Sequence, residues 1–304
     1  MSGRALVESL TADITRDYPV LANGLLANQL ADDDPLWEWA AVAAEHVLQT
    51  TGTDDRRISE CAEAFVVTSL DFLRLQARFL KTGAYAQSSA AATSTLYSDG
   101  DRMTEYLDGL ALSYAMWPNH TRMLQSFATD FVPVVPLGGR VLEIGPGHGL
   151  LASVLLSRRD DVHYTGIDIS ARSIAYSAAA FAATGIAPDR YELVVGDASM
   201  PDAGFAFGAF ASTICCEVLE HVDDPASLLA TLARLMDPGA PAFLSTVANM
   251  EAQDHVYLFH DVAHIRKTIT GAGFTIDADQ PLGLAGAEHL TPKPVNYSAI
   301  VRSR

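Results

Sequence analysis

The chain has 304 residues, enough for one large domain or two smaller ones, and 49% of them are hydrophobic, which is ample for a buried core. Acidic residues outnumber basic residues by 37 to 20, giving a formal charge of −17, so most of the surface would repel a phosphate backbone or an anionic membrane. We therefore expect an enzyme-sized globular protein with neither a nucleic-acid nor a membrane partner.

The N-terminus and the cysteines indicate the cellular compartment in which we expect the protein. The first twenty residues, MSGRALVESLTADITRDYPV, lack a basic start followed by an apolar stretch, and nowhere do eighteen apolar residues run together. We expect a cytoplasmic protein. Cys61, Cys215 and Cys216 fit neither a disulfide framework nor a thiolate zinc site, so they are expected to be core residues in a reducing compartment.

The first part of the chain, from residue 3 to about 130, has helical periodicity and no convincing strand. One helix is predicted over residues 34–52, which open with an Asp-Pro pair and end in glycine. A long amphipathic helix is predicted over residues 54–83, because apolar residues recur there at three- and four-residue intervals up to Gly83.

A break and a boundary follow these helices. The stretch QSSAAATST at 87–95 has nothing large to bury, which predicts a mobile connector. The helical rhythm then resumes at residue 101 and is interrupted at Pro118. We expect residues 1–130 to form an all-helical cap and residues 131–304 to form a second domain, with no internal repeat in either.

After about residue 136, short apolar runs alternate with helical segments, the pattern of a parallel sheet with crossover helices. The predicted strands, in chain order, cover residues 140–145, 162–169, 190–197, 209–216 and 241–248. The helices between them are predicted to begin near His148, Ala171, Pro225 and Asp261. A short loop joins two further strands, so we expect antiparallel pairing between residues 274–279 and 296–303.

The motif VLEIGPGHG carries three glycines, Gly145, Gly147 and Gly149, where the first predicted strand runs into a helix. Such a turn presents free backbone N–H groups and the positive end of a helix dipole. The spacing is G-x-G-x-G, and Leu150 stands where a dinucleotide-binding motif has its third glycine. Glu143, two residues before the turn, would place a carboxylate at the mouth of the pocket, which favours an ammonium or sulfonium over a pyrophosphate.

Two more acids follow the next strands. Asp168 lies nineteen positions beyond Gly149 and can accept hydrogen bonds from both hydroxyls of a ribose. Asp197, in VVGDAS, is an acceptor suited to an adenine amino group, with small residues beside it. Glu143, Asp168 and Asp197 at successive strand ends thus predict a site for a cationic nucleoside.

The motifs VLEIGPGHG, YTGIDIS, VVGDAS and CCEVLEHVDDP resemble those of class I S-adenosylmethionine-dependent methyltransferases, above all the small-molecule group that includes quinone-biosynthesis enzymes. The resemblance covers about residues 118–304. It implies a Rossmann-like seven-stranded sheet, mostly parallel with an antiparallel last strand and flanked by helices. It also implies S-adenosylmethionine as cofactor and S-adenosylhomocysteine as product. The expected cofactor-binding residues are Glu143, Gly145, Gly147, Gly149, Asp168, Ile169, Asp197, Ala198 and Glu217.

A sulfonium methyl is transferred by in-line attack, so the protein must align the two molecules, exclude water and sometimes remove a proton. The residues expected on the acceptor side and able to take a proton are His221, His255 and His260. A structural histidine beneath the site is an open alternative for His221. His260 and His264 have the i, i+4 spacing of a metal pair, but no H-E-x-x-H motif is completed and Asp261 suits a helix cap, so we expect no metal.

Aromatic residues of the helical region are the other acceptor-side candidates. Tyr106 and Tyr114 are eight positions apart and can share a helix face, while Trp117 and His120 follow at the break. They are either core residues or part of a lid that contacts the cofactor carboxylate or the acceptor. Together with Tyr257, these are the expected substrate-binding residues.

The expected function is methyl transfer to an amino-acid-like or specialised-metabolite acceptor, with N- or O-transfer favoured over C-transfer because imidazole bases are available. A dimer through the helical cap is a further expectation. Two alternatives stay open. One is a protein that uses the bound cofactor in a non-methylating reaction or in partner binding. The other is an NAD(P)-dependent oxidoreductase, which Leu150 and Glu143 both oppose.

Overall fold

A computed structural model gives the fold of the chain. The structure describes residues 1–304 except 53, 88, 90–95, 199–204, 207, 285, 286 and 288. The connector that the sequence predicts at 87–95 lies almost entirely outside the described residues. Cys61 and Cys215 are buried, as expected, and Cys216 is partly buried. Among the described helices, none combines the length and the apolar character that a membrane crossing requires.

The first part of the chain is helical, as predicted. Its main helices are α1 (Gly3–Asp17), α2 (Leu36–Thr51), α3 (Asp55–Thr82), α5 (Gly100–Met116) and α6 (Pro118–Ser126). The helix α3 ends at Gly83, which adopts the left-handed conformation that glycine favours at this position. Pro118 begins α6 after a break at Trp117, because proline fits the first turn of a helix but not its interior.

The second part of the chain forms a seven-stranded sheet in the order β3-β2-β1-β4-β5-β7-β6. Its strands are β1 (Arg140–Ile144), β2 (His163–Asp168), β3 (Tyr191–Val195), β4 (Ser212–Cys216), β5 (Pro241–Ala248), β6 (Phe274–Gly283) and β7 (Val295–Ser303). The first five are parallel, and β7 pairs antiparallel with both β5 and β6. The predicted fold class and the antiparallel final pair are confirmed.

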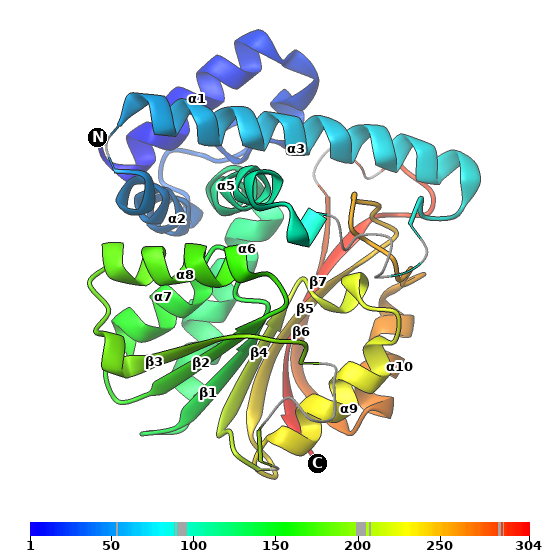
Figure 1. The fold of residues 1–304 in the computed structure, drawn as a ribbon. Helices are drawn as coiled ribbons and strands as arrows, with labels where there is room; N and C mark the ends of the chain where they lie inside the picture. The colour runs from blue at the N-terminus through cyan, green and yellow to red at the C-terminus, as the bar shows by residue number, and fades with distance from the viewer. Residues whose placement is uncertain are drawn as a thin grey trace.

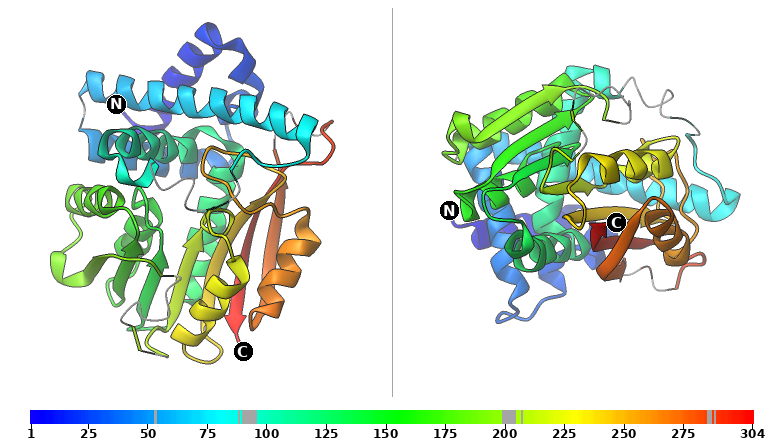
Figure 2. Two further views of the ribbon diagram at one scale, coloured as in Figure 1. Left: turned by 45° about the vertical axis from the view of Figure 1, so that its right-hand side comes forward. Right: turned by 90° about the horizontal axis from the view of Figure 1, so that it is seen from below.

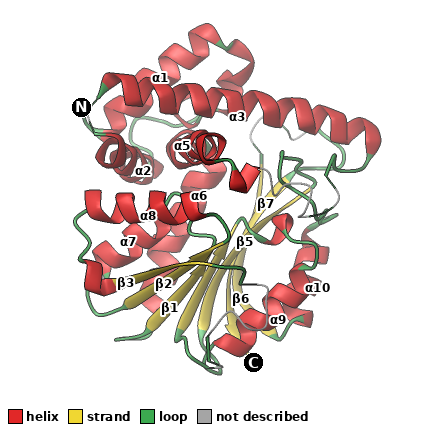
Figure 3. Cartoon of the chain, in the orientation of Figure 1, coloured by secondary structure: helices red, strands yellow, loops and turns green. Residues whose placement is uncertain are grey.

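Helices cover both faces of the sheet (Figures 1 and 3). They are α7 (Leu150–Arg158), α8 (Ala171–Ala183), α9 (Pro225–Leu235) and α10 (Val262–Gly271). Side chains of Ser170, Asp224 and Asp261 cap three of them by accepting backbone N–H groups of the first turn. The helix predicted to begin near His148 begins two residues later, because Gly149 is in the left-handed conformation.

The helical part lies over the carboxyl ends of the parallel strands, with α3 running across it (Figures 1 and 2). Its last turns also cover the sheet: the rings of Phe127 and Phe131 pack 5.3 and 5.6 Å from Phe243 of β5. One apolar core therefore extends from α1 to the sheet. A domain boundary at residue 130 remains a prediction.

Candidate active site

A large cleft lies between the carboxyl ends of the strands and helices α3 and α5. Its volume is 1710 Å³, whereas small-molecule sites usually occupy about 300–1,000 Å³. One wall consists of the turns that follow β1, β2 and β3, and the opposite wall consists of α3, α5 and the loop after β5. The cleft therefore has room for two small molecules side by side.

The glycine turn after β1 forms part of the first wall. Gly145, Gly147 and Gly149 have φ angles of 68°, 54° and 76°, a conformation that other residues rarely adopt. Gly145 and Gly147 line the cleft, and a Cβ on Gly147 would find no atom closer than 3.7 Å. Gly149 does not line it, since a Cβ there would lie 3.2 Å from the backbone of Ser177 in α8. Gly149 therefore serves the turn and helix packing, and its expected role in binding the cofactor stays a prediction.

Glu143 differs from the sequence expectation. It lines the cleft but is buried, with 2% of its surface exposed, whereas the sequence predicts a carboxylate at the mouth. The hydroxyl of Tyr164 donates a hydrogen bond to it at 2.5 Å. Burial raises the pKa of Glu143 to about 7, despite that hydrogen bond. Near neutral pH this side chain is therefore partly protonated and a weaker source of negative charge than expected.

The ribose and adenine candidates lie along the same wall. Asp168, Ile169, Asp197 and Ala198 all line the cleft at the ends of β2 and β3. The backbone N–H of Ser170 donates to Asp168 at 2.8 Å, which orients the carboxylate. Burial raises the pKa of Asp168 to about 6. A bare glycine turn followed by an oriented carboxylate is a donor and acceptor set that fits a nucleoside cofactor.

The opposite wall holds Asp254, which the sequence reasoning missed. It belongs to the loop that follows β5, residues 249–258, which we call the acceptor-side loop. The Asp254 side chain is fully buried, and its Oδ2 accepts hydrogen bonds from Tyr97 at 3.0 Å and Tyr106 at 2.8 Å. The Nδ1–H of His221 donates to the carbonyl of Asp254 at 3.1 Å and lies 3.5 Å from Oδ2.

These contacts set the charges of the pair. Burial alone would lower the pKa of His221, but the carboxylates of Asp254 and Glu220 outweigh it and raise that pKa above its ordinary value. Burial would conversely raise the pKa of Asp254, and the imidazoles of His221 and His255 hold it below the ordinary value. His221 is thus an imidazole that holds a proton unusually well and lines the cleft.

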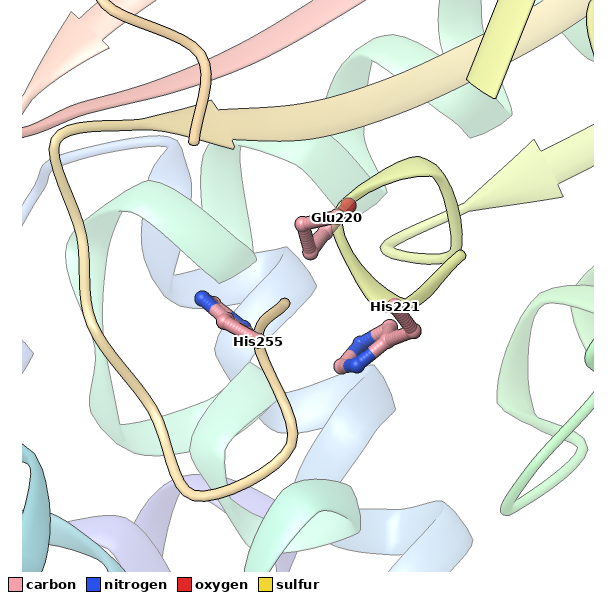
Figure 4. Close-up of side chains that lie close together, drawn as sticks. All are labelled: Glu220, His221 and His255. Carbon is pink, nitrogen blue, oxygen red and sulfur yellow. The ribbon is translucent and has the colours of Figure 1, made fainter. Parts of the chain in front are cut away.

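Glu220, His221 and His255 converge (Figure 4). One polar atom from each lies within 4.8 Å of the other two, a spacing compatible with one shared cation. The Nδ1–H of His255 donates to the carbonyl of Met250 at 2.7 Å. Glu220 accepts from Thr246 at 2.7 Å, and its other oxygen has no hydrogen-bond partner among the described residues. Burial lowers the pKa of His221, and among the charges that raise it, that of Glu220 is second to that of Asp254.

Glu217 lies after β4 with a φ of 51° and lines the cleft. Ser245 donates to it at 2.7 Å and Asn296 at 3.2 Å, both from the sheet itself. Burial, followed by the charge of Glu220, raises the pKa of Glu217 to about 8. The Nδ2 of Asn296 lies 3.2 Å from both carboxyl oxygens of Glu217, and the Oδ1 of Asn296 has no hydrogen-bond partner among the described residues.

The aromatic residues at the end of α5 lie beside the glycine turn. The rings of Tyr114 and His148 are 5.0 Å apart, and those of Trp117 and His120 are 5.1 Å apart. Tyr114, Trp117 and His120 all line the cleft, as does Tyr106 further along α5. Burial lowers the pKa of His120 to about 4, so this imidazole is neutral.

Two predicted acceptor-side residues lie outside the cleft. Tyr257 packs on Phe259 with ring centroids 4.8 Å apart, and His260 stacks on His264 at the exposed start of α10. Asp261 caps that helix, as expected, by accepting from the N–H of His264 at 2.7 Å. The structure thus places Tyr257 and His260 apart from the other acceptor-side candidates.

Comparisons with known proteins agree with this geometry. A family model described as a methyltransferase domain matches residues 116–274, slightly more than half of the chain. A ubiquinone biosynthesis O-methyltransferase from Dechloromonas aromatica is 37% identical over 112 residues, covering 36% of this chain and 45% of that protein. One from Thiobacillus denitrificans is 36% identical over 136 residues, covering 44% and 55%.

The chain spans about half the length of these curated relatives. Among solved structures, the cyclase SpnF matches with a TM-score of 0.55 at 16% identity, covering 72% of this chain and 97% of that one. A likeness at that identity concerns the fold alone.

Proposed function

The chain belongs to the methyltransferase-domain family, and from this premise we propose that it methylates a hydroxyl group of a neutral, aromatic small molecule. S-adenosylmethionine, when bound, supplies an electrophilic methyl group. The residues suited to hold it are those of the first wall: the amides of the glycine turn, Asp168 for the ribose, and Asp197 with Ala198 for the adenine. In this proposal residues 1–130 act as a cap that excludes water from the cleft.

The observation that carries the proposal is the contact between His221 and Asp254. Because Nδ1–H of His221 donates to the Asp254 carbonyl, only Nε2 can take up a proton. A hydroxyl acceptor loses its proton as the new C–O bond forms, and His221 is the imidazole positioned to receive it. Asp254 then stabilises the imidazolium, since its carboxylate lies 3.5 Å away.

The walls of the cleft support a neutral acceptor with an aromatic ring. Acidic side chains outnumber arginines among the lining residues by about three to one, so a carboxylate or phosphate on the acceptor would be repelled. Phe72, Tyr97 and Tyr106 provide aromatic surface on the acceptor side. The amino-acid-like acceptor expected from the sequence is less favoured for this reason, and the names of the curated relatives point to oxygen as the methylated atom.

The proposal is tested with purified protein, S-adenosylmethionine and three probes: catechol, its carboxylated analogue protocatechuate, and benzylamine. We expect O-methylated catechol by mass spectrometry, at least about tenfold faster than methylated protocatechuate, because a buried unpaired carboxylate is costly. Methylation of benzylamine without methylation of catechol would contradict O-transfer and favour N-transfer. Cofactor binding without methylation of any probe would favour the non-methylating alternative.

A further inference from the structure

The buried side chain of Gln76 connects the helical part to the acceptor-side loop. Gln76 lies in α3 and is 4% exposed. Its Nε2 donates to the carbonyl of Asn249 at 2.8 Å, and its Oε1 accepts from the N–H of Glu251 at 3.1 Å. One amide group thus holds two backbone groups of a loop that is more than 170 residues away in sequence.

Neighbouring side chains hold the same short segment. The hydroxyl of Tyr85 accepts from the N–H of Met250 at 3.1 Å, and Arg78 donates to the fully buried carboxylate of Glu251 at 2.8 Å. Asn249 has a φ of 56°, in the left-handed region, which asparagine adopts more readily than most residues. Three side chains from residues 76–85 thus hold residues 249–251 of the loop.

The same loop positions the imidazoles of the acceptor side. The Met250 carbonyl accepts from Nδ1–H of His255 at 2.7 Å, and the Asp254 carbonyl accepts from Nδ1–H of His221 at 3.1 Å. Both carbonyls lie within a few residues of the segment that Gln76 holds. The orientation of the two rings thus depends on backbone that α3 fixes.

We propose that Gln76 is a positioning residue for His221 and His255. It acts through the acceptor-side loop, so the helical part sets the geometry of the acceptor side in addition to covering the cleft. This inference rests on the proposed function for its catalytic meaning, but its structural content can be tested without cofactor or acceptor.

The test is proton NMR of the hydrogen-bonded imidazole N–H groups in the full chain, with Gln76→Glu as the variant. This substitution keeps the shape of the side chain but turns an oxygen lone pair toward the Asn249 carbonyl in place of the N–H donor. The matched control is Ser69→Ala in the same helix, where the hydroxyl bonds only to Phe65 of α3 itself at 2.8 Å. His46, whose Nε2–H donates to the His148 carbonyl at 3.2 Å, is an internal reference remote from the loop.

In the wild type we expect slowly exchanging downfield N–H signals from His46, His221 and His255. In Gln76→Glu the signals of His221 and His255 should be lost or exchange at least about tenfold faster, while that of His46 and the affinity for S-adenosylhomocysteine by calorimetry stay unchanged. Ser69→Ala should keep all three signals. Unchanged His221 and His255 signals, or equal loss of all three with a general loss of stability, would overturn the proposal.

A second variant and a kinetic measurement complete the test of Gln76. If Gln76→Glu does not fold, Tyr85→Phe removes only the acceptor of the Met250 N–H and should weaken the same two signals selectively. If the wild type methylates catechol, Gln76→Glu should lower kcat about 10- to 100-fold with KM for S-adenosylmethionine within twofold of wild type, as expected for misplaced catalytic groups. Failure of S-adenosylhomocysteine binding in the wild type would count against the proposed function and leave the NMR result interpretable.

Discussion

The two walls of the cleft are built differently. The cofactor wall consists of the glycine turn, Asp168 and Asp197, which follow consecutive strands of one parallel sheet. The acceptor wall is assembled across the whole chain: Tyr97 and Tyr106 reach Asp254 over separations of 157 and 148 residues, and Gln76 reaches Asn249 over 173. The first wall is a consequence of chain order in an α/β sheet, and the second depends on how a separate set of helices packs over it.

Substitutions should therefore be able to impair one wall without impairing the other. A change on the cofactor wall should reduce nucleoside affinity and leave the acceptor-side hydrogen bonds intact. A change on the acceptor wall should reduce turnover and leave nucleoside affinity intact. Any variant that does both would show that the walls are coupled more tightly than the contacts indicate.

The largest expected effect concerns the proposed base. His221→Gln should lower kcat for O-methylation about 10²- to 10⁴-fold, because the acceptor proton would have no positioned imidazole to receive it. Affinity for S-adenosylhomocysteine, measured by calorimetry, should change less than about threefold. The matched control is His260→Gln, at an exposed position outside the cleft, which should leave both quantities unchanged. Equal kcat values for the two variants would remove His221 from the reaction.

The next effect tests the cofactor wall. Asp168→Asn should weaken S-adenosylhomocysteine about 10- to 100-fold, since charged hydrogen bonds contribute about 1.5–3 kcal/mol each. The imidazole N–H signals of His221 and His255 should persist. Asp189→Asn, at an exposed position outside the cleft, is the control. Wild-type affinity of the Asp168→Asn variant for S-adenosylhomocysteine, measured by calorimetry, would contradict the proposed ribose site.

A smaller effect appears in the pH dependence. His221 must be unprotonated to accept a proton, so kcat/KM should rise with pH through its pKa, which Asp254 raises. Asp254→Asn removes that carboxylate, so the pKa of His221 should fall and the acidic limb should move to lower pH. The maximal rate should also fall about tenfold, because the imidazolium loses its partner. A limb that stays in place over about pH 5 to 9 would show that Asp254 does not govern His221.

The smallest effect is one of stability, at the junction of the two walls. Burial raises the pKa of Glu217 to about 8, from an ordinary value of 4.5, so the folded state keeps a proton that the unfolded state releases. The contribution of Glu217 to the free energy of unfolding is therefore fully present below about pH 4.5 and is lost as pH rises toward 8. Glu217→Gln stays neutral, so its stability relative to wild type should increase from pH 5 to pH 8 by on the order of 2 kcal/mol in urea unfolding. Parallel pH profiles would contradict a protonated Glu217.

The sequence was sufficient for the sheet and for most of the cofactor wall. The strands, the glycine turn and the cap at Asp261 follow from patterns within a few residues, because local patterns determine local structure. The sequence did not predict the burial of Glu143, which is 2% exposed and accepts a hydrogen bond from Tyr164, because no local pattern reports such burial.

The acceptor wall could not be predicted in the same way. Asp254 stands in a loop without periodicity, and its partners Tyr97, Tyr106 and His221 are brought to it by packing between distant elements. His255 lines the cleft and His260 does not, although only five residues separate them. Phe259, just before His260, bridges Ala248 of β5, and this pairing is a property of the tertiary structure.

A crystal structure with S-adenosylhomocysteine would test most directly whether the two walls meet at His221. We expect the ribose hydroxyls to bond to Asp168 and the sulfur to face the side of the cleft where His221 and Asp254 lie. A sulfur directed instead toward Trp117 and His120, or a nucleoside bound away from the glycine turn, would contradict this expectation.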